Sequence, residues 1–191
     1  ILNGVHTMSV LAGYNAGFKI VRDMINDKAF KAYIDKGLNE EIIKTIDLDE
    51  NELKAFANSV IERFNNPFID HKLLDISLNS VAKFKARCLC SLLDYYNKFG
   101  KVPSVLSFSF AALINFYEDF ENKDYPVNDV ESVLYFFKAK HNDIVFDVLA
   151  NVGFWGEDLT KIDGLYKKVK AYFDDIKSLG ISTAMEKLLN E

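Results

Sequence analysis

Residues that interrupt helices are scarce in this sequence, which contains three prolines and nine glycines among 191 residues. Proline and glycine are the strongest local breakers of regular structure, so their scarcity favours helices joined by short connections. Cysteine is scarcer still, and the two that occur, Cys88 and Cys90, stand two positions apart. Side chains at that spacing point in different directions on a helix, which argues against a bridge between them. We therefore expect reduced thiols in a cytoplasmic protein.

An excess of positive charge is also missing from the sequence. The 23 Lys and Arg residues are outnumbered by 28 Asp and Glu residues, and both signs are spread along the chain. Without a basic stripe, no nucleic-acid partner is predicted. No apolar run approaches the roughly 20 residues that a membrane-spanning helix needs, so no membrane partner is predicted either. No histidine cluster accompanies the cysteines, and we predict no metal site.

Apolar and aromatic residues are plentiful by contrast. Hydrophobic residues make up 49% of the chain, including sixteen Phe and nine Tyr, which is enough for a substantial core. The apolar residues recur with helical spacing, and we find no strand alternation, no glycine-rich loop after a strand and no internal repeat. These patterns predict one all-α multi-helix bundle over residues 1–191, with no nucleotide-binding site of its own.

The expected helices can be placed by their apolar spacing and their breakers. We predict a first helix over residues 7–26, a short second helix that ends near Gly37, and an amphipathic helix after residue 49 that carries Leu53, Phe56, Val60 and Phe64. A break is expected near Asn79 and Ser80, whose side chains offer the backbone alternative hydrogen bonds. Further on we predict a fully buried helix after Ser104, a helix capped by Asn128 or Asp129, a helix that stops at Gly180, and a short last helix.

The first turn of the chain contains the first candidate site. Asn3 and His6 stand three residues apart, so on a helix their side chains share one face. An amide can donate a hydrogen bond to a carbonyl or alkoxide oxygen, and an imidazole can donate, accept or orient a neighbour. The pair could hold an oxygen that changes charge during a reaction. The plainer interpretation is a helix cap followed by a partly buried histidine, and the spacing alone favours it.

A second candidate lies in the segment "NNPFIDHKLLDISLNSVAKFKAR". Asn79, Lys83 and Arg87 recur every four residues and therefore fall on one helical face. An amide in line with two cations suits an anionic ligand, because arginine can grip a carboxylate with two hydrogen bonds. The alternative is an ordinary solvated face. His71, near the start of the segment, is undecided between a structural and a functional role.

Several motifs in order resemble the C-terminal domain of the mannitol dehydrogenase family, the polyol-specific long-chain dehydrogenases. They are "LNGVHT" before an Ala- and Gly-rich helix, "FANSVIERFNNPFIDHKLLDISLNSVAKFKAR", "SFAALINFY" and "FWGEDLTKIDGL". Within the family the sequence is most similar to the tagaturonate reductases, also called altronate oxidoreductases. The resemblance extends over nearly the whole chain.

The resemblance implies an all-α fold like the C-terminal domain of 6-phosphogluconate dehydrogenase and an N-terminal Rossmann domain that binds NAD. It implies an enzyme of hexuronate catabolism that interconverts D-altronate and D-tagaturonate. The family's catalytic lysine would fall just before Ile1, with Asn3 and His6 completing its motif and Lys83 contacting the substrate, supported by Asn79 and Arg87. We therefore expect this chain alone to be inactive. A fructuronate reductase, a mannitol or mannitol 1-phosphate dehydrogenase, and a non-catalytic helical interaction module remain alternatives.

Overall fold

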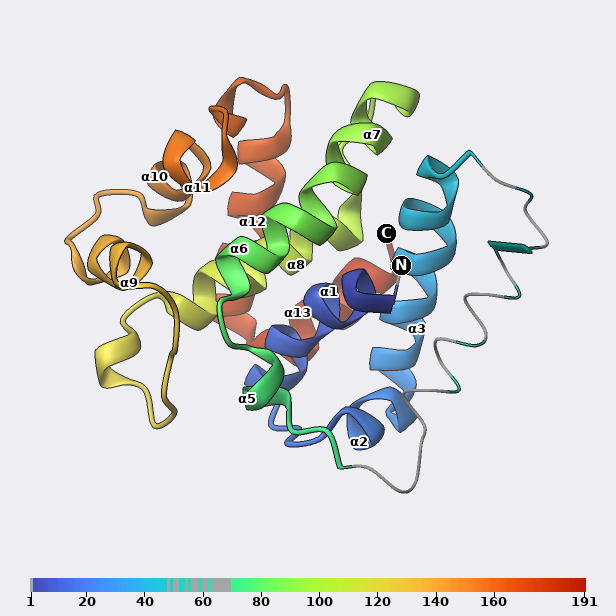
Figure 1. Ribbon diagram of the computed structural model, residues 1–191, viewed down its shortest axis with the longest axis horizontal. Helices are drawn as coiled ribbons and strands as arrows, with labels where there is room; N and C mark the ends of the chain where they lie inside the picture. The colour runs from blue at the N-terminus through green and yellow to red at the C-terminus, as the bar shows by residue number, and fades with distance from the viewer. Residues whose placement is uncertain are drawn as a thin grey trace.

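The computed structural model describes residues 2–47, 49, 52, 53, 55, 59, 62 and 70–191. Within these residues all regular structure is helical, apart from one isolated antiparallel bridge between Ile20 and Lys72. The α-helices, followed in Figure 1, are α1 (Leu2–Asn15), α2 (Val21–Asn26), α3 (Lys28–Lys36), α5 (Leu73–Ile76), α6 (Ser80–Phe84), α7 (Cys90–Phe99), α8 (Ser104–Tyr117), α9 (Glu131–Lys138), α10 (Ile144–Leu149), α11 (Val152–Trp155), α12 (Leu165–Leu179) and α13 (Ile181–Leu189). The all-α prediction is confirmed.

Shorter turns of other helical types connect or extend these helices. Two of them are π-helical, η1 (Gly37–Ile42) and η3 (Lys85–Leu89), and three are 3₁₀ turns, η2 (Ile43–Thr45), η4 (Phe120–Asn122) and η5 (Leu159–Lys161). The turn η3 joins α6 to α7 without a break, so the three form one continuous rod. A π turn holds one residue more than an α turn and is frequent at functional sites.

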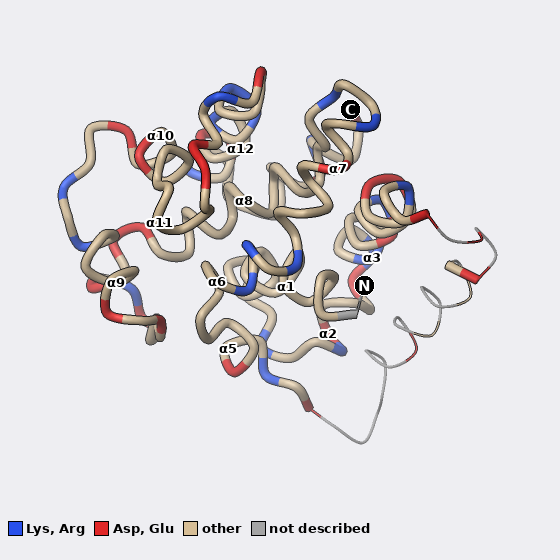
Figure 2. The backbone as a smooth tube through the Cα atoms, turned by 45° about the horizontal axis from the view of Figure 1, so that its top comes forward, with Lys and Arg blue, Asp and Glu red and all other residues tan. Residues whose placement is uncertain are grey.

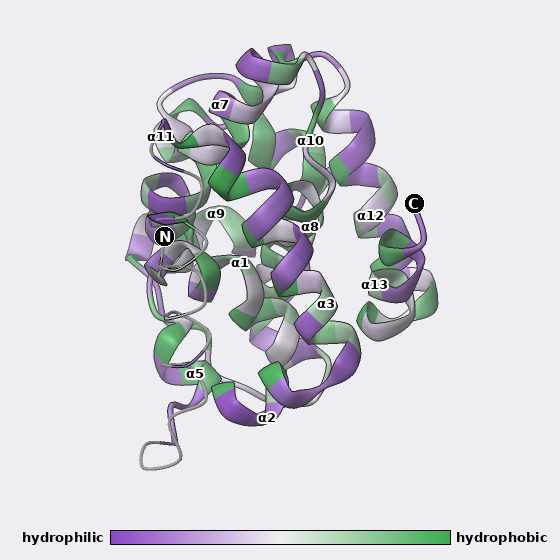
Figure 3. Cartoon of the chain, turned by 90° about the vertical axis from the view of Figure 1, so that its right-hand side faces the viewer, coloured by the Kyte–Doolittle hydropathy of each residue, from purple (hydrophilic) through white to green (hydrophobic). Residues whose placement is uncertain are grey.

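Helix α8 runs through the middle of the molecule and packs against α1 and α12 (Figure 1). Every residue from Val105 to Tyr117 is buried except Asn115, as predicted for a helix that is apolar all round. Helix α12 is amphipathic and carries both hydrophilic and hydrophobic residues in Figure 3, whereas most of α1 is buried. Its buried stripe includes Val169, Phe173 and Ile176.

The buried start of α8 is capped by a residue from a distant turn. Its N-cap residue is Pro103, whose side chain cannot accept a hydrogen bond. Glu41, on η1, does so instead: its two carboxylate oxygens accept from the backbone N–H groups of Val105 at 2.8 Å and Leu106 at 2.9 Å. The Glu41 side chain thus satisfies two donors that a buried helix start would otherwise leave without a partner.

The prediction of one helix over residues 7–26 is wrong, because the chain folds as α1 and α2 with a turn between them. Gly17 adopts a left-handed conformation with φ of +100°. The N–H of Phe18 donates to the carbonyl of Gly13 at 3.1 Å, and the N–H of Gly17 donates to that of Tyr14 at 2.9 Å. These two bonds form a Schellman motif, which ends α1 although the apolar spacing continues.

Two further helix boundaries also differ from the prediction. The α-helical part of the second helix does end beside Gly37, as predicted, but the chain stays helical there, because Gly37 has φ of −62° and begins η1. A Cβ atom there would lie 2.6 Å from Met8 Sδ and Val105 Cγ1, so the glycine permits close packing. Neither Asn128 nor Asp129 is the N-cap of α9, which is Val130. The Asp129 carboxylate is engaged elsewhere, because it accepts a hydrogen bond from the Tyr117 hydroxyl at 2.5 Å.

Other expected boundaries are confirmed. The chain breaks before α6, where Asn79 is left-handed with φ of 54°. Gly180, at positive φ, ends α12 as predicted, and Gly100, also at positive φ, ends α7. The expected amphipathic helix after residue 49 lies mostly outside the described residues, including its Phe56, Val60 and Phe64.

Candidate active site at the start of helix α1

The start of α1 lies directly against the π turn η3, and a glycine permits this approach. Gly4 is buried, and a Cβ atom at this position would lie 3.3 Å from the carbonyl oxygen of Arg87. The Cys88 thiol lies 3.6 Å from the carbonyl oxygen of Gly4 and donates a hydrogen bond to it. The beginning of α1 is therefore held at a fixed place beside the basic segment of α6 and η3, as Figure 2 shows.

Asn3 is exposed on the first turn of α1. Its backbone carbonyl accepts a hydrogen bond from the Thr7 hydroxyl at 2.8 Å, whereas its side-chain amide bonds to no other described residue. An amide with both donors available can bind an oxygen atom of a ligand. The position fits the predicted role, which stays a prediction.

His6 lies one turn further along α1 and is half-buried. Burial, followed by the charges of His71, Arg87 and Lys83 in that order, lowers the pKa of His6 from 6.5 to about 4. The imidazole is therefore neutral near pH 7, with one nitrogen that donates and one that accepts a hydrogen bond. A neutral imidazole can orient a lysine amine or a substrate hydroxyl without adding charge.

The lowered pKa of His6 predicts a loss of stability in acid. A folded-state pKa below the unfolded value means that protonation favours unfolding, so stability is complete above about pH 6.5 and falls as the pH approaches 4. We expect a His6→Gln variant to remove about 3 kcal/mol of this pH dependence. Denaturation of both proteins between pH 7 and 4 measures the difference, and parallel stability curves would contradict it.

Lys83 and Arg87 both reach the region of His6 from the rod formed by α6 and η3. The Lys83 ammonium donates to the carbonyl of Ile76 at 2.9 Å, and the Arg87 guanidinium donates to the Thr7 hydroxyl at 3.4 Å. Burial and then the charge of Arg87 lower the pKa of Lys83, while Asp129 opposes the shift. The two cations thus lie close together, as their spacing predicts. Each keeps further donors for a ligand.

Asn79 has a clear structural task at the start of α6. Its N–H donates to the carbonyl of Asn128 at 3.0 Å, and its own carbonyl accepts from the N–H of Lys83 at 3.1 Å. Asparagine tolerates the left-handed backbone that this junction requires. Its half-buried amide bonds to no other described residue, and its supporting role in substrate binding stays a prediction.

His71 is the residue that sequence spacing did not resolve. It lies 65 positions from His6, yet it heads the charges that act on the His6 imidazole. No local pattern predicts this interaction, because it depends on tertiary contacts such as those between α5 and α1. The charges of His71, Lys83 and Arg87 thus all act on His6, and these four residues are called the His6 cluster.

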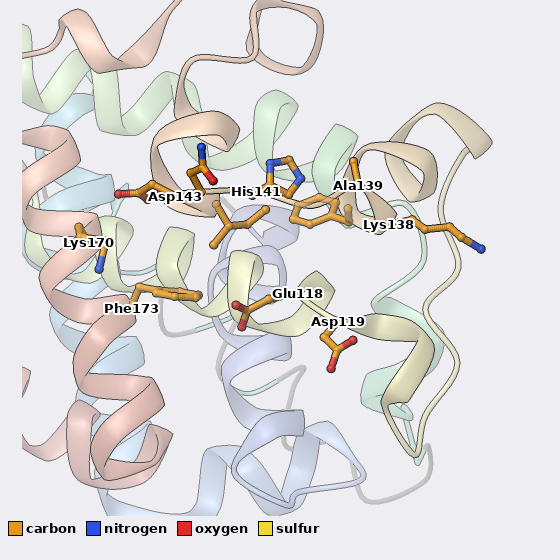
Figure 4. A pocket seen from close by; sticks show the side chains of 11 residues that line it. Glu118, Asp119, Lys138, Ala139, His141, Asp143, Lys170 and Phe173 are labelled. Atoms are coloured by element: carbon orange, nitrogen blue, oxygen red, sulfur yellow. The ribbon is translucent and has the colours of Figure 1, made fainter.

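A separate pocket of about 410 Å³ opens between the end of α8, the α9–α10 connection and α12 (Figure 4). The charged groups around it are paired with neighbours, such as Glu118 with Lys177 at 2.6 Å and Lys138 with Glu121 at 2.6 Å. Mutually paired charges leave little with which to bind an ion, and we assign this pocket no chemistry.

The part of the chain that the structure describes offers no metal site, since no group of three His, Cys, Asp or Glu side chains comes together there. None of its helices is long and apolar enough to cross a membrane. The two cysteines are free, with Cys88 buried and Cys90 exposed.

Comparison with known proteins finds similarity over nearly the whole chain. The mannitol dehydrogenase C-terminal domain family matches residues 1–177. Altronate oxidoreductases of Klebsiella pneumoniae (strain 342) and Yersinia pestis are 39% and 38% identical to the chain over 98% and 97% of its length. The chain spans 41% of the length of each of these relatives.

Two solved structures share the fold. The Pseudomonas fluorescens mannitol 2-dehydrogenase, in a ternary complex with NAD and D-mannitol, superimposes with a TM-score of 0.87 over the whole chain and 39% of its own, at 18% identity. A substrate-free D-sorbitol dehydrogenase gives 0.79 over 97% of this chain and 39% of its own, at 21% identity. These likenesses show the fold, and the match of the family over residues 1–177 shows that the chain belongs to the mannitol dehydrogenase C-terminal domain family.

Proposed function

We propose that this chain is the substrate-binding domain of an NAD-dependent altronate oxidoreductase, or tagaturonate reductase. The reaction converts D-altronate and NAD into D-tagaturonate and NADH, and it belongs to hexuronate catabolism in the cytoplasm. The observation that carries the proposal is the identity of 37–39% to altronate oxidoreductases over nearly the whole chain. The cluster of cations beside His6 supports it, because altronate is an anion and a neutral polyol is not.

The dinucleotide is assigned to a preceding N-terminal Rossmann domain. The described residues contain no strand that leads through a glycine-rich turn into a helix, so they offer no cradle for the phosphates of NAD. Bound NAD supplies the hydride chemistry at the carbon that bears the reacting oxygen. This chain supplies a wall of the substrate site, and on its own it is expected to be inactive.

The residues of this chain then act on the oxygen and on the rest of the substrate. In the direction of reduction, Asn3 donates a hydrogen bond to the carbonyl oxygen as negative charge develops on it. A lysine just before Ile1 gives that oxygen a proton, and takes the proton back in the reverse direction. Neutral His6 orients the lysine or the substrate. Lys83, supported by Arg87 and Asn79, contacts the carboxylate or a chain hydroxyl.

Turnover of a substrate panel by the complete protein tests the proposal. We expect the highest kcat/KM with NAD for D-altronate, compared with D-mannonate, mannitol and mannitol 1-phosphate. The cationic cluster should favour a carboxylate over a neutral chain. Preference for mannonate would point to a fructuronate reductase, and preference for mannitol or its phosphate to the polyol enzymes. No turnover of any of them would favour a non-catalytic helical module.

A further inference from the structure

The hydroxyl of Thr7 joins the first turn of α1 to the guanidinium of Arg87. It donates a hydrogen bond to the backbone carbonyl of Asn3 at 2.8 Å and accepts one from Arg87 Nη1 at 3.4 Å. These roles are fixed, because a carbonyl can only accept and a guanidinium can only donate. One buried side chain thus links two residues that stand 4 and 80 positions away from it in the sequence.

Backbone contacts set the relative position of the two segments that this hydroxyl links. The Cys88 thiol donates to the carbonyl of Gly4 at 3.6 Å, and a Cβ atom on Gly4 would lie 3.3 Å from the carbonyl oxygen of Arg87. Thr7 and Arg87 therefore extend from backbones that are packed directly against each other. The hydroxyl can act as a fixed anchor for one end of the long arginine side chain.

The Arg87 guanidinium has no other anchor in the described part of the chain. Its hydrogen bond to Thr7 is the one contact of this kind that it makes there, and no described carboxylate pairs with it. The side chain is half-buried, so its charge is partly withdrawn from water. The remaining N–H donors of a planar guanidinium can hold both oxygens of a carboxylate.

We propose that Thr7 is a positioning residue that orients the guanidinium of Arg87 toward the carboxylate of the sugar acid. The inference rests on the proposed function, in which Arg87 supports Lys83 at that carboxylate. With one donor held by Thr7, the arginine side chain has less freedom to lose when its other donors bind a ligand. This contact is made to the bound substrate as well as to the transition state, so Thr7 acts on binding rather than on the chemical step.

Steady-state kinetics of the complete enzyme with altronate and NAD test this role. A Thr7→Val variant replaces the hydroxyl by a methyl group, and we expect KM for altronate to rise about fivefold while kcat stays within about twofold. A Thr7→Ser variant keeps a hydroxyl and should restore most of the affinity.

The matched control is Ser9→Ala on the same helix. The buried Ser9 hydroxyl donates to the carbonyl of Val5 at 2.8 Å, which is the same bond to the residue four positions back, but no described cation donates to it. Its removal should leave KM unchanged. A rise of KM equal to that of the Thr7→Val variant would mean that a disturbed α1, and not the anchoring of Arg87, lowers the affinity, and would overturn the inference.

A double-mutant cycle with Arg87→Ala separates positioning from a structural role. If Thr7 acts through Arg87, Thr7→Val should hardly raise KM in the Arg87→Ala background, because the group that it orients is gone. Equal fold-changes of KM in the two backgrounds would overturn the inference. So would a KM that Thr7→Val alone leaves unchanged.

The unaltered enzyme tests the proposed function separately. If it turns over altronate while the variants depart from these expectations, the role of Thr7 alone is wrong. If it accepts mannonate or mannitol 1-phosphate in place of altronate, the proposed function fails, and the same cycle is measured with that anion. Preference for neutral mannitol, or no turnover of any of these substrates, would overturn both proposals.

Discussion

Replacing Asn3 by alanine in the complete enzyme is expected to lower kcat by about 10²–10³-fold. The amide is proposed to donate to the reacting oxygen, and the bond strengthens as that oxygen becomes negative. Because the side chain is exposed and bonds to no other described residue, the midpoint of thermal unfolding should hardly move. Turnover at saturating altronate and a thermal melt of the same preparation measure the two effects.

The matched control for this variant is Asn26→Ala. Asn26 is an exposed asparagine at the end of α2, a helix that carries no proposed site residue, and no activity change is expected there. Parallel loss of folding and turnover in the Asn3 variant would instead support the plainer interpretation of Asn3 as a helix cap.

Replacing Glu41 by alanine is expected to destabilise the protein by about 2–4 kcal/mol, because the N–H groups of Val105 and Leu106 would lose their acceptor inside the core. Burial raises the pKa of the Glu41 carboxyl, and hydrogen bonds from the backbone at the start of α8 oppose that rise. Burial thus disfavours the charged Glu41 carboxylate, while its two hydrogen bonds stabilise the start of α8. Chemical denaturation of the complete protein gives the change in the free energy of unfolding.

Glu40→Ala supplies the comparison for the Glu41 variant. Glu40 is the preceding residue on the same π turn, and its side chain is exposed. Loss of this surface charge should change stability by less than about 0.5 kcal/mol. Equal effects of the two substitutions would show that the carboxylate of Glu41 is not what holds the start of α8.

The class of fold and part of the candidate site could be predicted because they depend on local spacing. Helical recurrence of apolar residues predicts an all-α body, and a separation of three or four residues predicts which side chains share a helical face. Asn3 with His6, and Lys83 with Arg87, are pairs of this kind. Such pairs need only the geometry of one helix, which the sequence specifies directly.

The remaining features depend on contacts between distant segments. Gly17 ends α1 by a backbone conformation that the apolar pattern does not reveal, and Gly37 serves close packing against Met8 and Val105. Glu41 reads in the sequence as one of two acidic neighbours, yet it caps a helix more than 60 positions away. His71 likewise becomes part of the cluster only when its segment pairs with residues 19–21.

The contact between Gly4 and Arg87 couples the two halves of the candidate site mechanically. Since a Cβ atom built on Gly4 would lie only 3.3 Å from the carbonyl oxygen of Arg87, the backbones of the two residues are in close contact. Densely packed segments deform little. We therefore expect the reacting end of the site, at Asn3 and His6, to keep a fixed separation from its cationic end, at Lys83 and Arg87. On the proposed function, a sugar acid one carbon shorter or longer is expected to bind less well, because the two halves of the site cannot slide past each other. Discrimination by chain length would then arise from rigidity rather than from any added contact.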